Sequence, residues 1–408
     1  MNCRFCNTSL ENVFVDLGFA PPSNSYLTNE GLKKGESYYP LKVYSCDKCK
    51  LVQLDEFKKA TEIFSEEYAY FSSMSRSWLA HSKDYVAKMV QDYGIGKDSL
   101  VTEIASNDGY LLQYFKEAGV PVLGIEPTES TARVSREKGI ETVIDFFGEK
   151  LATKLVTAGK KSDLVLGNNV LAHVPDIIDF VKGIKLLLKD DGIVTMEFPH
   201  LLQLIKHNQF DTIYHEHFSY LSFTTVYEIF KKEGIELFHV EEIPTHGGSL
   251  RIFGKQSLNS SLTRRKSVDR VLNLEDNEGI NTKSYYTGFQ NRVESVKFDF
   301  LEFLLKAKKD GKKVAGYGAA AKGNTLLNYS GVKSDLIEFV VDAAPLKQNK
   351  FLPGSHVPIV KENILKEQKP DYIIVFPWNI KKEIMHQLEY AKEWGAKFVI
   401  FIPELAIV

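Results

Sequence analysis

The chain has 408 residues, more than one typical hydrophobic core accommodates, so its length predicts two or three domains. Hydrophobic residues make up 44% and charged residues 25%, a composition that excludes a largely disordered chain. The 51 basic and 53 acidic residues leave a net charge of −2, which gives no global field for nucleic acid or an anionic membrane.

The N-terminal residues lack the charged and apolar regions of a secretory leader, and no apolar run reaches the roughly 18 residues of a membrane span. We therefore expect a cytoplasmic protein, monomeric or a small homo-oligomer, without nucleic-acid or membrane partners. In a reducing compartment, paired cysteines favour metal ligands or redox thiols over structural disulfides.

All four cysteines fall into two C-x-x-C pairs, Cys3 with Cys6 and Cys46 with Cys49. Each pair sets two thiolates across a tight turn, as a tetrahedral structural Zn²⁺ site requires. A redox dithiol is the alternative, but it normally opens a helix in a βαβ unit, whereas these pairs lie in short polar turns. Because Pro21-Pro22 and the Gly31 to Gly35 stretch break the chain, we expect a loop-dominated zinc module over 1–65.

Beyond this module the periodicity predicts an amphipathic helix over 75–93 and then a doubly wound parallel α/β sheet. The expected strands are 100–105, 120–125, 142–144, 163–167 and 192–198, and the expected helices are 109–117, 130–138, 148–157 and 177–188. A helix over 224–233 and an antiparallel pair over 235–244 and 249–253 would complete a domain over 66–255.

The last part of the chain predicts a second, Rossmann-like α/β domain over 256–408. A polar stretch over 256–285 has the composition of connecting surface, and a helix over 287–307 follows it. The remaining expected strands are 313–317, 337–342, 371–376 and 397–401, with helices over 323–329 and 380–393.

The first strand of the central domain ends in the turn E-I-A-S-N-D-G, residues 103–109. The next strand ends at Glu126, where a carboxylate can hold the ribose hydroxyls of an adenosine cofactor. NAD needs three glycines beside its pyrophosphate, and this turn has lost two of them. The acidic Glu103 suits the ammonium and sulfonium groups of S-adenosylmethionine (SAM) instead, although a plain strand-to-helix turn is the alternative. The predicted cofactor-binding residues are Glu103, Ala105, Ser106, Asn107, Asp108, Gly109, Glu126, Asn168 and Asn169.

Two further segments carry polar groups that can perform chemistry. Asn168 and His173 follow a central strand, at the ligand crevice of such folds, where they could face a methyl group. The cluster Y-H-E-H-F-S-Y over 214–220 does not meet H-E-x-x-H zinc chemistry, because its histidines are two residues apart. In extended chain Tyr214, Glu216 and Tyr220 would share one face, and a merely solvated loop is the alternative.

A second Gly/Ala-rich turn, K-V-A-G-Y-G-A-A-A-K-G-N over 313–324, opens the C-terminal alternation. Its backbone N–H groups and Lys322 at a helix N-terminus predict a diphosphate site, with Asp342 in the ribose position. Taken alone, this turn could be a vestigial NAD-binding site. Beside a SAM-type site it favours a nucleotide-linked substrate.

Taken in order, these motifs resemble the SAM-dependent sugar C-methyltransferases that build branched deoxysugars, and the similarity spans nearly the whole chain. The resemblance implies a zinc-binding, a SAM-binding and a Rossmann-like domain, with the nucleotide sugar bound between them. It also implies methylation at C3 of a dTDP-linked 4-keto-6-deoxyhexose. Base-catalysed enolate formation suits this chemistry, because a proton α to a ketone is weakly acidic.

The resemblance assigns roles to the matching positions only. His217 matches the proposed base, Tyr214 and Glu216 match its neighbours, and His173 matches another active-site histidine. The chain has Ala105-Ser106 where the family usually has Gly-Ser. The tyrosine expected to face the sugar is Tyr68, with Tyr70 as the alternative, and the predicted substrate-binding residues are Tyr70, Ser72, Gly318, Lys322, Asn324 and Asp342. A nicotinamide-dependent oxidoreductase and a non-catalytic zinc-bearing binding protein are the competing hypotheses.

Overall fold

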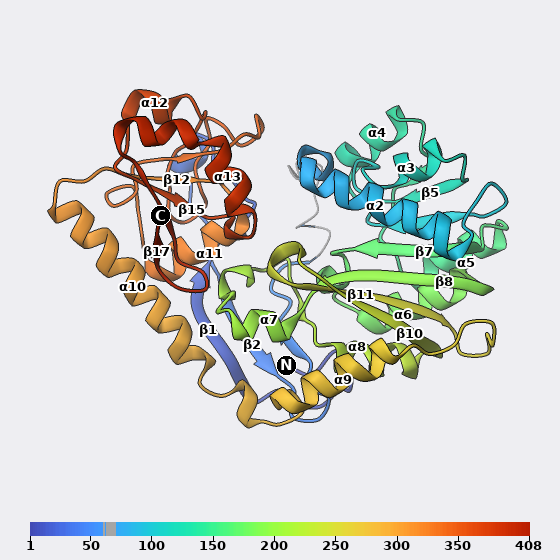
Figure 1. Ribbon diagram of the computed structural model, residues 1–408. Coiled ribbons are helices and arrows are strands. Elements are labelled where there is room, and N and C mark those ends of the chain that lie inside the picture. Colours follow the sequence, from blue (N-terminus) through green and yellow to red (C-terminus); the bar gives the residue numbers. More distant parts are fainter. Residues whose placement is uncertain (60–61, 63–70) are drawn as a thin grey trace.

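The computed structural model describes residues 1–59, 62 and 71–408, and this part of the chain forms three β-sheets (Figure 1). The N-terminal sheet is antiparallel and has the order β1-β2-β3-β9. It consists of β1 (Asn12–Ala20), β2 (Tyr39–Ser45), β3 (Val52–Leu54) and β9 (Ser219–Tyr220). Its fourth strand therefore comes from the middle of the chain.

Most of the described residues of the N-terminal module are turns and loops, as expected, but β1 and β2 also pair as an antiparallel ladder that the sequence analysis did not predict. Irregularities in the register hide this ladder in the sequence: the pairing shifts between Asp16 and Phe19, where Gly18 adopts a φ of +73°. The shift breaks the strict alternation of apolar residues that identifies a strand. Val13 and Phe19 are exposed, whereas Val15 is fully buried.

The central sheet has the order β10-β11-β8-β7-β4-β5-β6, and its strands run in one direction except for β11, which lies antiparallel between β8 and β10. Its strands are β4 (Val101–Ile104), β5 (Val122–Ile125), β6 (Thr142–Val143), β7 (Ser162–Asn168), β8 (Leu188–Pro199), β10 (Ile235–Ile243) and β11 (Ser249–Gln256). The strand order reverses between β4 and β7, so their carboxyl ends open on the crevice where such folds bind ligands. The doubly wound sheet predicted from the sequence is confirmed.

Helices cover both faces of the central sheet (Figure 1). They are α2 (Arg76–Tyr93), α3 (Leu112–Glu117), α4 (Glu129–Glu137), α5 (Glu149–Thr157), α6 (Ile177–Leu187) and α8 (Phe223–Lys232). Helix α7 (Leu201–Lys206) instead buries its apolar residues in the core shared by the N- and C-terminal sheets. Buried residues of α2 and α3 belong to the core on one face, and those of α5, α6 and α8 to the core on the other.

The polar stretch at 256–285 is not simple connecting surface, because it contains helix α9 (Lys266–Glu278). Within α9 only Val268, Val271 and Glu275 are buried. Because only two of the thirteen residues are buried and apolar, the helical periodicity of this segment is weak. The helix is stabilised by packing against β10 and α8.

The C-terminal sheet has the order β14-β13-β12-β15-β16-β17, parallel except for β17. Its strands are β12 (Val314–Tyr317), β13 (Val340–Val341), β14 (Ile359–Val360), β15 (Tyr372–Val375), β16 (Lys397–Ile400) and β17 (Ala406–Ile407). The helices of this region are α10 (Phe289–Lys309), α11 (Ala321–Ser330), α12 (Ile364–Gln368) and α13 (Lys381–Gln387). None of the helices in the described ranges has the length and apolarity needed to cross a membrane.

The single helix expected over 380–393 is in fact two pieces. The α-helix α13 ends at Gln387, and the chain continues as the 3₁₀ helix η8 (Glu389–Trp394). Ile384, Leu388 and Ala391 are buried along both pieces, so the apolar spacing that suggested one helix is real. Spacing of three and four residues fits either helix type, and therefore could not locate the transition.

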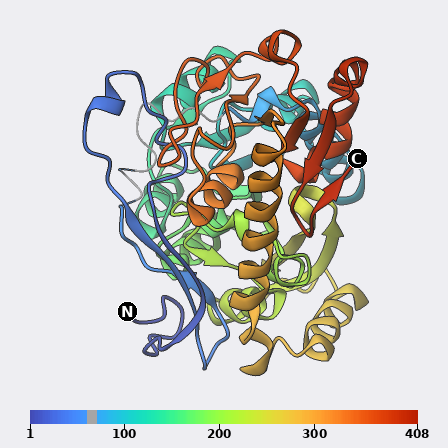
Figure 2. The ribbon, with the colours of Figure 1, turned by 90° about the vertical axis from the view of Figure 1, so that its left-hand side faces the viewer.

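The N-terminal sheet shares its core with the C-terminal unit. Phe14 of β1 stacks on Phe289 of α10 with ring centroids 4.7 Å apart, and both belong to a core that reaches Leu327 and Val340. Figure 2 shows α10 running beside these N-terminal strands. The N-terminal module thus contacts the C-terminal unit through its core and the central unit through β9.

Candidate active site

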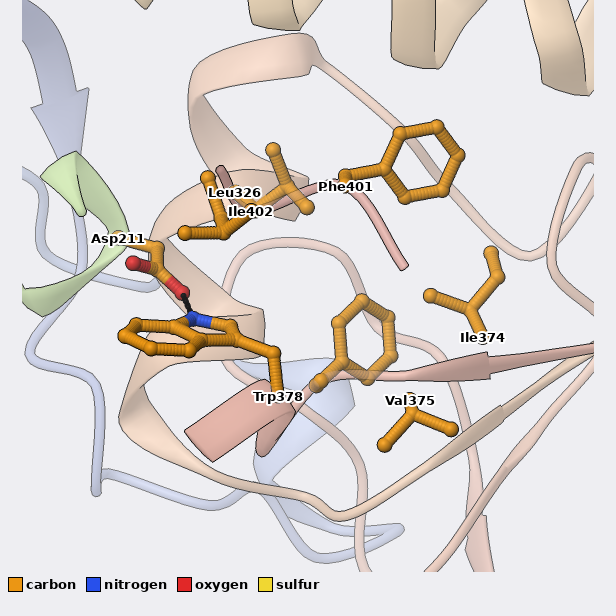
Figure 3. Close-up of a pocket in the computed structure, with 8 residues that line it drawn as sticks. Asp211, Leu326, Ile374, Val375, Trp378, Phe401 and Ile402 are labelled. Atoms are coloured by element: carbon orange, nitrogen blue, oxygen red, sulfur yellow. Dashed lines mark hydrogen bonds between the residues drawn. The ribbon is translucent and has the colours of Figure 1, made fainter. Parts of the chain in front are cut away.

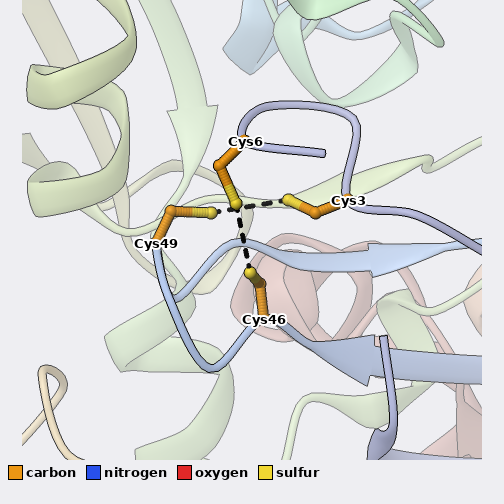
Figure 4. Close-up of side chains that lie close together, drawn as sticks. All are labelled: Cys3, Cys6, Cys46 and Cys49. Atoms are coloured by element: carbon orange, nitrogen blue, oxygen red, sulfur yellow. Dashed lines mark hydrogen bonds between the residues drawn. The ribbon is translucent and has the colours of Figure 1, made fainter. Parts of the chain in front are cut away.

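The four cysteines converge on one point, as Figure 4 shows. Their sulfur atoms all lie within 4.8 Å of one another, with Cys3 Sγ 3.4 Å from Cys49 Sγ and Cys6 Sγ 3.5 Å from Cys46 Sγ. A Zn–S bond of about 2.3 Å places tetrahedral sulfur ligands about 3.8 Å apart, so the arrangement fits Zn²⁺. Four thiolates fill a tetrahedral shell and leave no position for a substrate, which makes the Zn²⁺ site structural.

Arg4 connects this zinc site to the Y-H-E-H segment. Its guanidinium donates to the carbonyl oxygens of Phe218 (2.5 Å) and Leu54 (2.7 Å). The Gln53 side chain accepts from Arg4 N at 3.0 Å and donates to Cys3 Sγ at 3.2 Å. A residue between two zinc ligands therefore holds the backbone next to His217.

The predicted cofactor turn after β4 has an unusual backbone. Ala105, Asn107 and Gly109 adopt positive φ angles of 57°, 49° and 73°. Within this turn Asn107 N donates to Glu126 Oε2 at 2.9 Å, and Thr128 N donates to Glu126 Oε1, also at 2.9 Å. The acid at the end of β5 therefore fixes the turn at the end of β4.

Several buried polar atoms around this turn lack a hydrogen-bond partner in the described part of the chain. They belong to Glu103, Ser106, Asp108, Asn168 and Asn169. Burial raises the pKa of Glu103 well above its usual value, and the hydroxyl of Tyr110 opposes the rise. The oxygens of Glu103, Asp108 and Asn169 can accept from the ammonium of a methionine moiety, and Asn168 Nδ2 can donate to its carboxylate, so these residues fit SAM.

The residues that follow the predicted Y-x-Y pair also touch this turn. Ser72 N donates to Asn107 Oδ1 at 2.9 Å, and the Ser73 hydroxyl donates to the Asp108 carboxylate. Ser72, predicted to bind substrate, is thus placed against the cofactor turn. Tyr68 and Tyr70 lie outside the described residues.

Two of the predicted catalytic residues, His173 and His217, meet edge to face with ring centroids 4.6 Å apart. His217 Nδ1 lies 2.8 Å from the Thr212 carbonyl oxygen, and His173 Nδ1 lies 2.8 Å from that of Glu216. A carbonyl can only accept, so each ring carries its proton on Nδ1 and a lone pair on Nε2. Burial lowers the pKa of His217 well below its usual value and that of His173 to about 4, so both rings are neutral bases.

Within residues 214–220 only β9 is extended, so the shared face considered for an extended chain does not form. His217 N donates to the Tyr214 carbonyl at 2.9 Å, which closes a turn and places the two rings 4.0 Å apart. The same turn directs His215 toward the carbonyls of Tyr39 and Pro40, away from His217. Alternation along a strand cannot apply where the chain turns back on itself.

Glu216, the third predicted member of this group, accepts from Asn24 Nδ2 at 2.7 Å. Asn24 belongs to the N-terminal module, and its amide oxygen in turn accepts from the Tyr26 hydroxyl at 3.2 Å. The structure therefore brings His173, Tyr214 and His217 together, with Glu216 tying their loop to the N-terminal module.

The Gly/Ala-rich turn after β12 is held by a carboxylate, as the cofactor turn after β4 is held by Glu126. Asp342, at the end of β13, accepts from Ala319 N and Ala344 N, both at 2.8 Å. Gly318 has a φ of +88° and packs so tightly on Pro377 that an added Cβ would lie 2.5 Å from its ring. Asn324 donates to the Ser23 carbonyl at 2.6 Å, so this predicted substrate ligand connects α11 to the N-terminal module.

Lys322 lies inside this second site. Its Nζ donates to Asn379 Oδ1 at 2.8 Å and sits 4.2 Å from the centroid of the Trp378 ring. Burial lowers the pKa of Lys322 to about 8, while Asp211 opposes the shift. Figure 3 shows Asp211 Oδ2 accepting from Trp378 Nε1, a bond of 2.6 Å.

Three family models match consecutive parts of the chain. They are described as "Putative zinc binding domain" (residues 3–64), "Methyltransferase domain" (79–240) and "C-methyltransferase C-terminal domain" (244–403). The curated C-methyltransferase NovU of Streptomyces niveus is 34% identical over 406 residues, which cover 100% of this chain and 96% of NovU. The chain belongs to the C-methyltransferase family. It is a SAM-dependent C-methyltransferase.

Solved structures resemble part of this methyltransferase. Magnesium protoporphyrin IX methyltransferase from Synechocystis PCC 6803, with bound SAM, is 16% identical and has a TM-score of 0.33 over 43% of this chain and 78% of that chain. A SAM-dependent methyltransferase from Clostridium acetobutylicum is 8% identical, with a TM-score of 0.35 over 43% and 91% of the two chains.

The sequence did not single out several residues that surround the methyltransferase site. The 3₁₀ turn η4 (Phe210–Thr212) supplies the carbonyl that holds His217 and the carboxylate that holds Trp378. Its neighbour Gln209 donates to the Gly247 carbonyl at 2.8 Å. These contacts join segments that are far apart in the sequence, so no local sequence pattern predicts them.

A buried ionic network lies behind the carboxyl end of β8 in this methyltransferase. Glu197 accepts from Arg251 Nε at 2.6 Å and lies 2.9 Å from His81 Nε2. Burial alone would raise its pKa, but the His81 hydrogen bond and the Arg251 charge keep the pKa of Glu197 below its usual range. Arg251 of β11 lies directly opposite Glu197 of β8 in the sheet, a pairing that the sequence does not reveal.

Proposed function

We propose that this enzyme transfers the methyl group of SAM to C3 of a dTDP-linked 4-keto-6-deoxyhexose. The observation that carries the proposal is a pair of neutral histidines, His173 and His217, in contact with each other and hydrogen-bonded through Nδ1. In each ring this leaves the Nε2 lone pair able to accept a proton from carbon. We also propose the three domains 1–65, 66–255 and 256–408.

The C-terminal turn supports a nucleotide-linked substrate. Lys322 is a partly buried cation at the start of α11, and Asp211, the carboxylate whose charge acts on it, already accepts a hydrogen bond from Trp378. A diphosphate would supply the missing counter-charge. Asp342 holds the backbone of this turn as Glu126 holds that of the SAM turn, so two nucleotide-type turns serve one reaction.

The chain's own residues account for the proton transfer. When bound, SAM supplies an electrophilic methyl group. His217 Nε2 accepts the C3 proton, and the Thr212 carbonyl holds the proton on Nδ1 so that the base stays in the required tautomer. Tyr214, whose ring lies 4.0 Å from that of His217, covers the base and limits its access to water. Glu126 and Glu103 would hold the ribose and ammonium of SAM.

The proposal is tested by incubating the full chain with methyl-labelled SAM and dTDP-4-keto-6-deoxyhexoses. We expect a sugar that is heavier by one methyl group attached to carbon, with S-adenosylhomocysteine released in equal amount. Product methylated only at oxygen or nitrogen would contradict carbon transfer. Calorimetry with NADH and NADPH tests the oxidoreductase hypothesis, for which we expect no binding.

The role of His217 is tested with His217→Asn, which keeps a polar side chain. We expect S-adenosylhomocysteine to bind as in the wild type, and solvent deuterium exchange at C3 to slow by roughly 10²- to 10⁴-fold. His207→Asn, an exposed histidine at the end of α7, is the matched control and should exchange normally. Exchange at the wild-type rate in His217→Asn would exclude it as the base.

A further inference from the structure

His246 lies at the site in a strained turn that connects β10 to β11. It belongs to the 3₁₀ turn η5 (Thr245–Gly247), and His246, Gly247 and Gly248 have successive φ angles of +54°, +90° and +115°. A non-glycine residue in the left-handed region costs on the order of 1–3 kcal/mol and persists only where its surroundings impose it.

The surroundings impose this conformation from three sides. A Cβ on Gly247 would lie 2.4 Å from Trp378 Cη2, and a Cβ on Gly248 would lie 2.6 Å from Gln203 Cγ. The Gly248 carbonyl accepts from His200 N at 3.1 Å. Only glycine fits at both positions, so the turn places the His246 ring by close packing against the C-terminal unit and α7.

The His246 ring is hydrogen-bonded in the opposite sense to that of His217. Its Nε2 lies 3.0 Å from Asn169 Nδ2 at the carboxyl end of β7. An amide nitrogen can only donate, so Nε2 accepts and the ring proton sits on Nδ1. Among the described residues no hydrogen bond engages Nδ1 of His246. One histidine of the site therefore offers a lone pair, and another offers an N–H.

The charges around His246 favour a neutral ring. Burial, together with the charges of Lys322 and His81, lowers the pKa of His246 to about 4, while Glu197 opposes this shift. His246 in turn lowers the pKa of His217, which places the two imidazoles in one electrostatic neighbourhood. A neutral imidazole can donate a hydrogen bond to an oxyanion without losing its proton to it.

We infer that His246 is a second catalytic residue, whose Nδ1–H donates a hydrogen bond to the substrate oxygen that becomes negative when His217 removes the carbon-bound proton. This inference rests on the proposed function. The C–H electron pair forms the C=C bond, the carbonyl π pair moves to oxygen, and the proton moves to His217 Nε2. His246 keeps its own proton throughout.

The tautomer is tested by nitrogen NMR on full-length protein labelled with ¹⁵N-histidine and bound to S-adenosylhomocysteine. His246→Asn assigns the His246 signals by removing them, and it suits the backbone because asparagine tolerates the left-handed region. We expect the shifts of a neutral ring protonated on Nδ1. A ring protonated on Nε2 would overturn the inference.

Kinetics test the role itself. In His246→Asn we expect S-adenosylhomocysteine affinity to stay within about twofold of wild type, while C3 deuterium exchange and kcat both fall about 10²- to 10³-fold, as for loss of an oxyanion donor. His386→Asn, on the exposed face of α13, is the control. Unchanged exchange in His246→Asn would overturn this inference alone, whereas a wild type that neither exchanges nor methylates the sugar would overturn the proposed function.

Discussion

Lys322 and Asp211 are two opposite charges buried against the same indole ring. Burial raises the pKa of Asp211 to about 6 and lowers that of Lys322 to about 8, while each group partly offsets the shift of the other. Between these values both are ionised. Above pH 8 the lysine loses its proton, and with it the charge available for a phosphate.

We therefore predict that the affinity for dTDP falls as the pH rises through 8, by up to about tenfold at pH 9, where about a tenth of Lys322 remains charged. Lys322→Arg keeps its charge and should bind dTDP equally at pH 7 and pH 9. Isothermal titration at the two pH values measures both. A wild-type affinity that is constant from pH 7 to 9 would contradict the role given to Lys322.

The glycine beside His246 gives a second prediction at this scale. Gly247→Ala introduces a Cβ that collides with Trp378, so we expect a loss of about 1–3 kcal/mol in stability and a large fall in turnover. Gly94→Ala is the matched control: its φ is +68°, but no atom lies within 4 Å of the added Cβ. Urea unfolding should show that Gly94→Ala costs only about 1 kcal/mol. Equal losses would show that backbone strain alone is responsible.

The sequence predicted His173, Tyr214 and His217 through a family motif, and Glu103 and Glu126 through their positions at strand ends. It could not predict His246, because a Thr-His-Gly-Gly run shows only that the chain turns. Which nitrogen of that ring carries the proton depends on Asn169, which is distant in sequence. The backbone of the cofactor turn could not be predicted either. Ala105 replaces the usual glycine of the family, and its φ of +57° explains why glycine is preferred at this position.

At the scale of elements, the zinc site is connected to the candidate active site by the side chain of Arg4. Arg4 Nη1 and Leu54 N both donate to the Phe218 carbonyl, so that carbonyl closes the edge between β3 and the His217 loop. A zinc ion stabilises the fold of such a module. Here the module holds the carbonyl of Phe218, the residue that follows the proposed base His217.

We predict that Arg4→Ala keeps one zinc per chain but loses about 1–3 kcal/mol of stability, because the Leu54 carbonyl is left without this buried donor. Proton exchange at C3 should slow as the loop loosens. Lys48→Ala, an exposed cation between the ligands of the second pair, is the control and should change neither property. Metal analysis and unfolding on the same samples decide the outcome, and loss of zinc in Arg4→Ala would contradict the prediction.

Cys46→Ser separates the metal from the arginine. Removing one of four thiolates should reduce the zinc content from one per chain to none, and should also lower stability and turnover. Retention of full activity without zinc would contradict a supporting role for the metal. Activity that is lost while zinc is retained would instead indicate a direct role for the thiol.

Elements with strong periodicity were predictable, and those held by tertiary contacts were not. The alternation of strands and helices from Val101 to Pro199 follows from apolar strands separated by amphipathic helices. Helix α9 was missed because it buries only Val268 and Val271 as apolar residues. β9 is only two residues long and exists because β3 offers it a free edge.

At the scale of the whole molecule, histidines whose pKa is lowered by burial, His215 among them, make stability depend on pH. The pKa values of His173 and His246 are lowered to about 4, and that of His217 lies well below its usual value. Below pH 6.5 the unfolded chain binds protons that the folded chain does not. The contribution of these histidines to the free energy of unfolding therefore falls as the pH drops from 6.5 toward 4.

Each such histidine contributes up to about 1.4 kcal/mol per pH unit to this slope. We predict that His173→Asn has a shallower fall of stability between pH 6 and 5 than the wild type, by about this amount. Urea unfolding at pH 7, 6 and 5 measures the difference. His386→Asn, which removes an exposed histidine, should leave the wild-type slope unchanged.

The fourth strand of the N-terminal sheet has a consequence for how the protein is made. β1, β2 and β3 leave the ribosome first, but β9 pairs with Val52 and Gln53 only after Ser219 and Tyr220 have been synthesised. Through most of the translation of the central unit, the nascent chain carries a zinc module with an open strand edge, the kind of edge on which chains aggregate. Chaperone capture during synthesis should therefore concentrate on β3, and should end when residue 220 emerges.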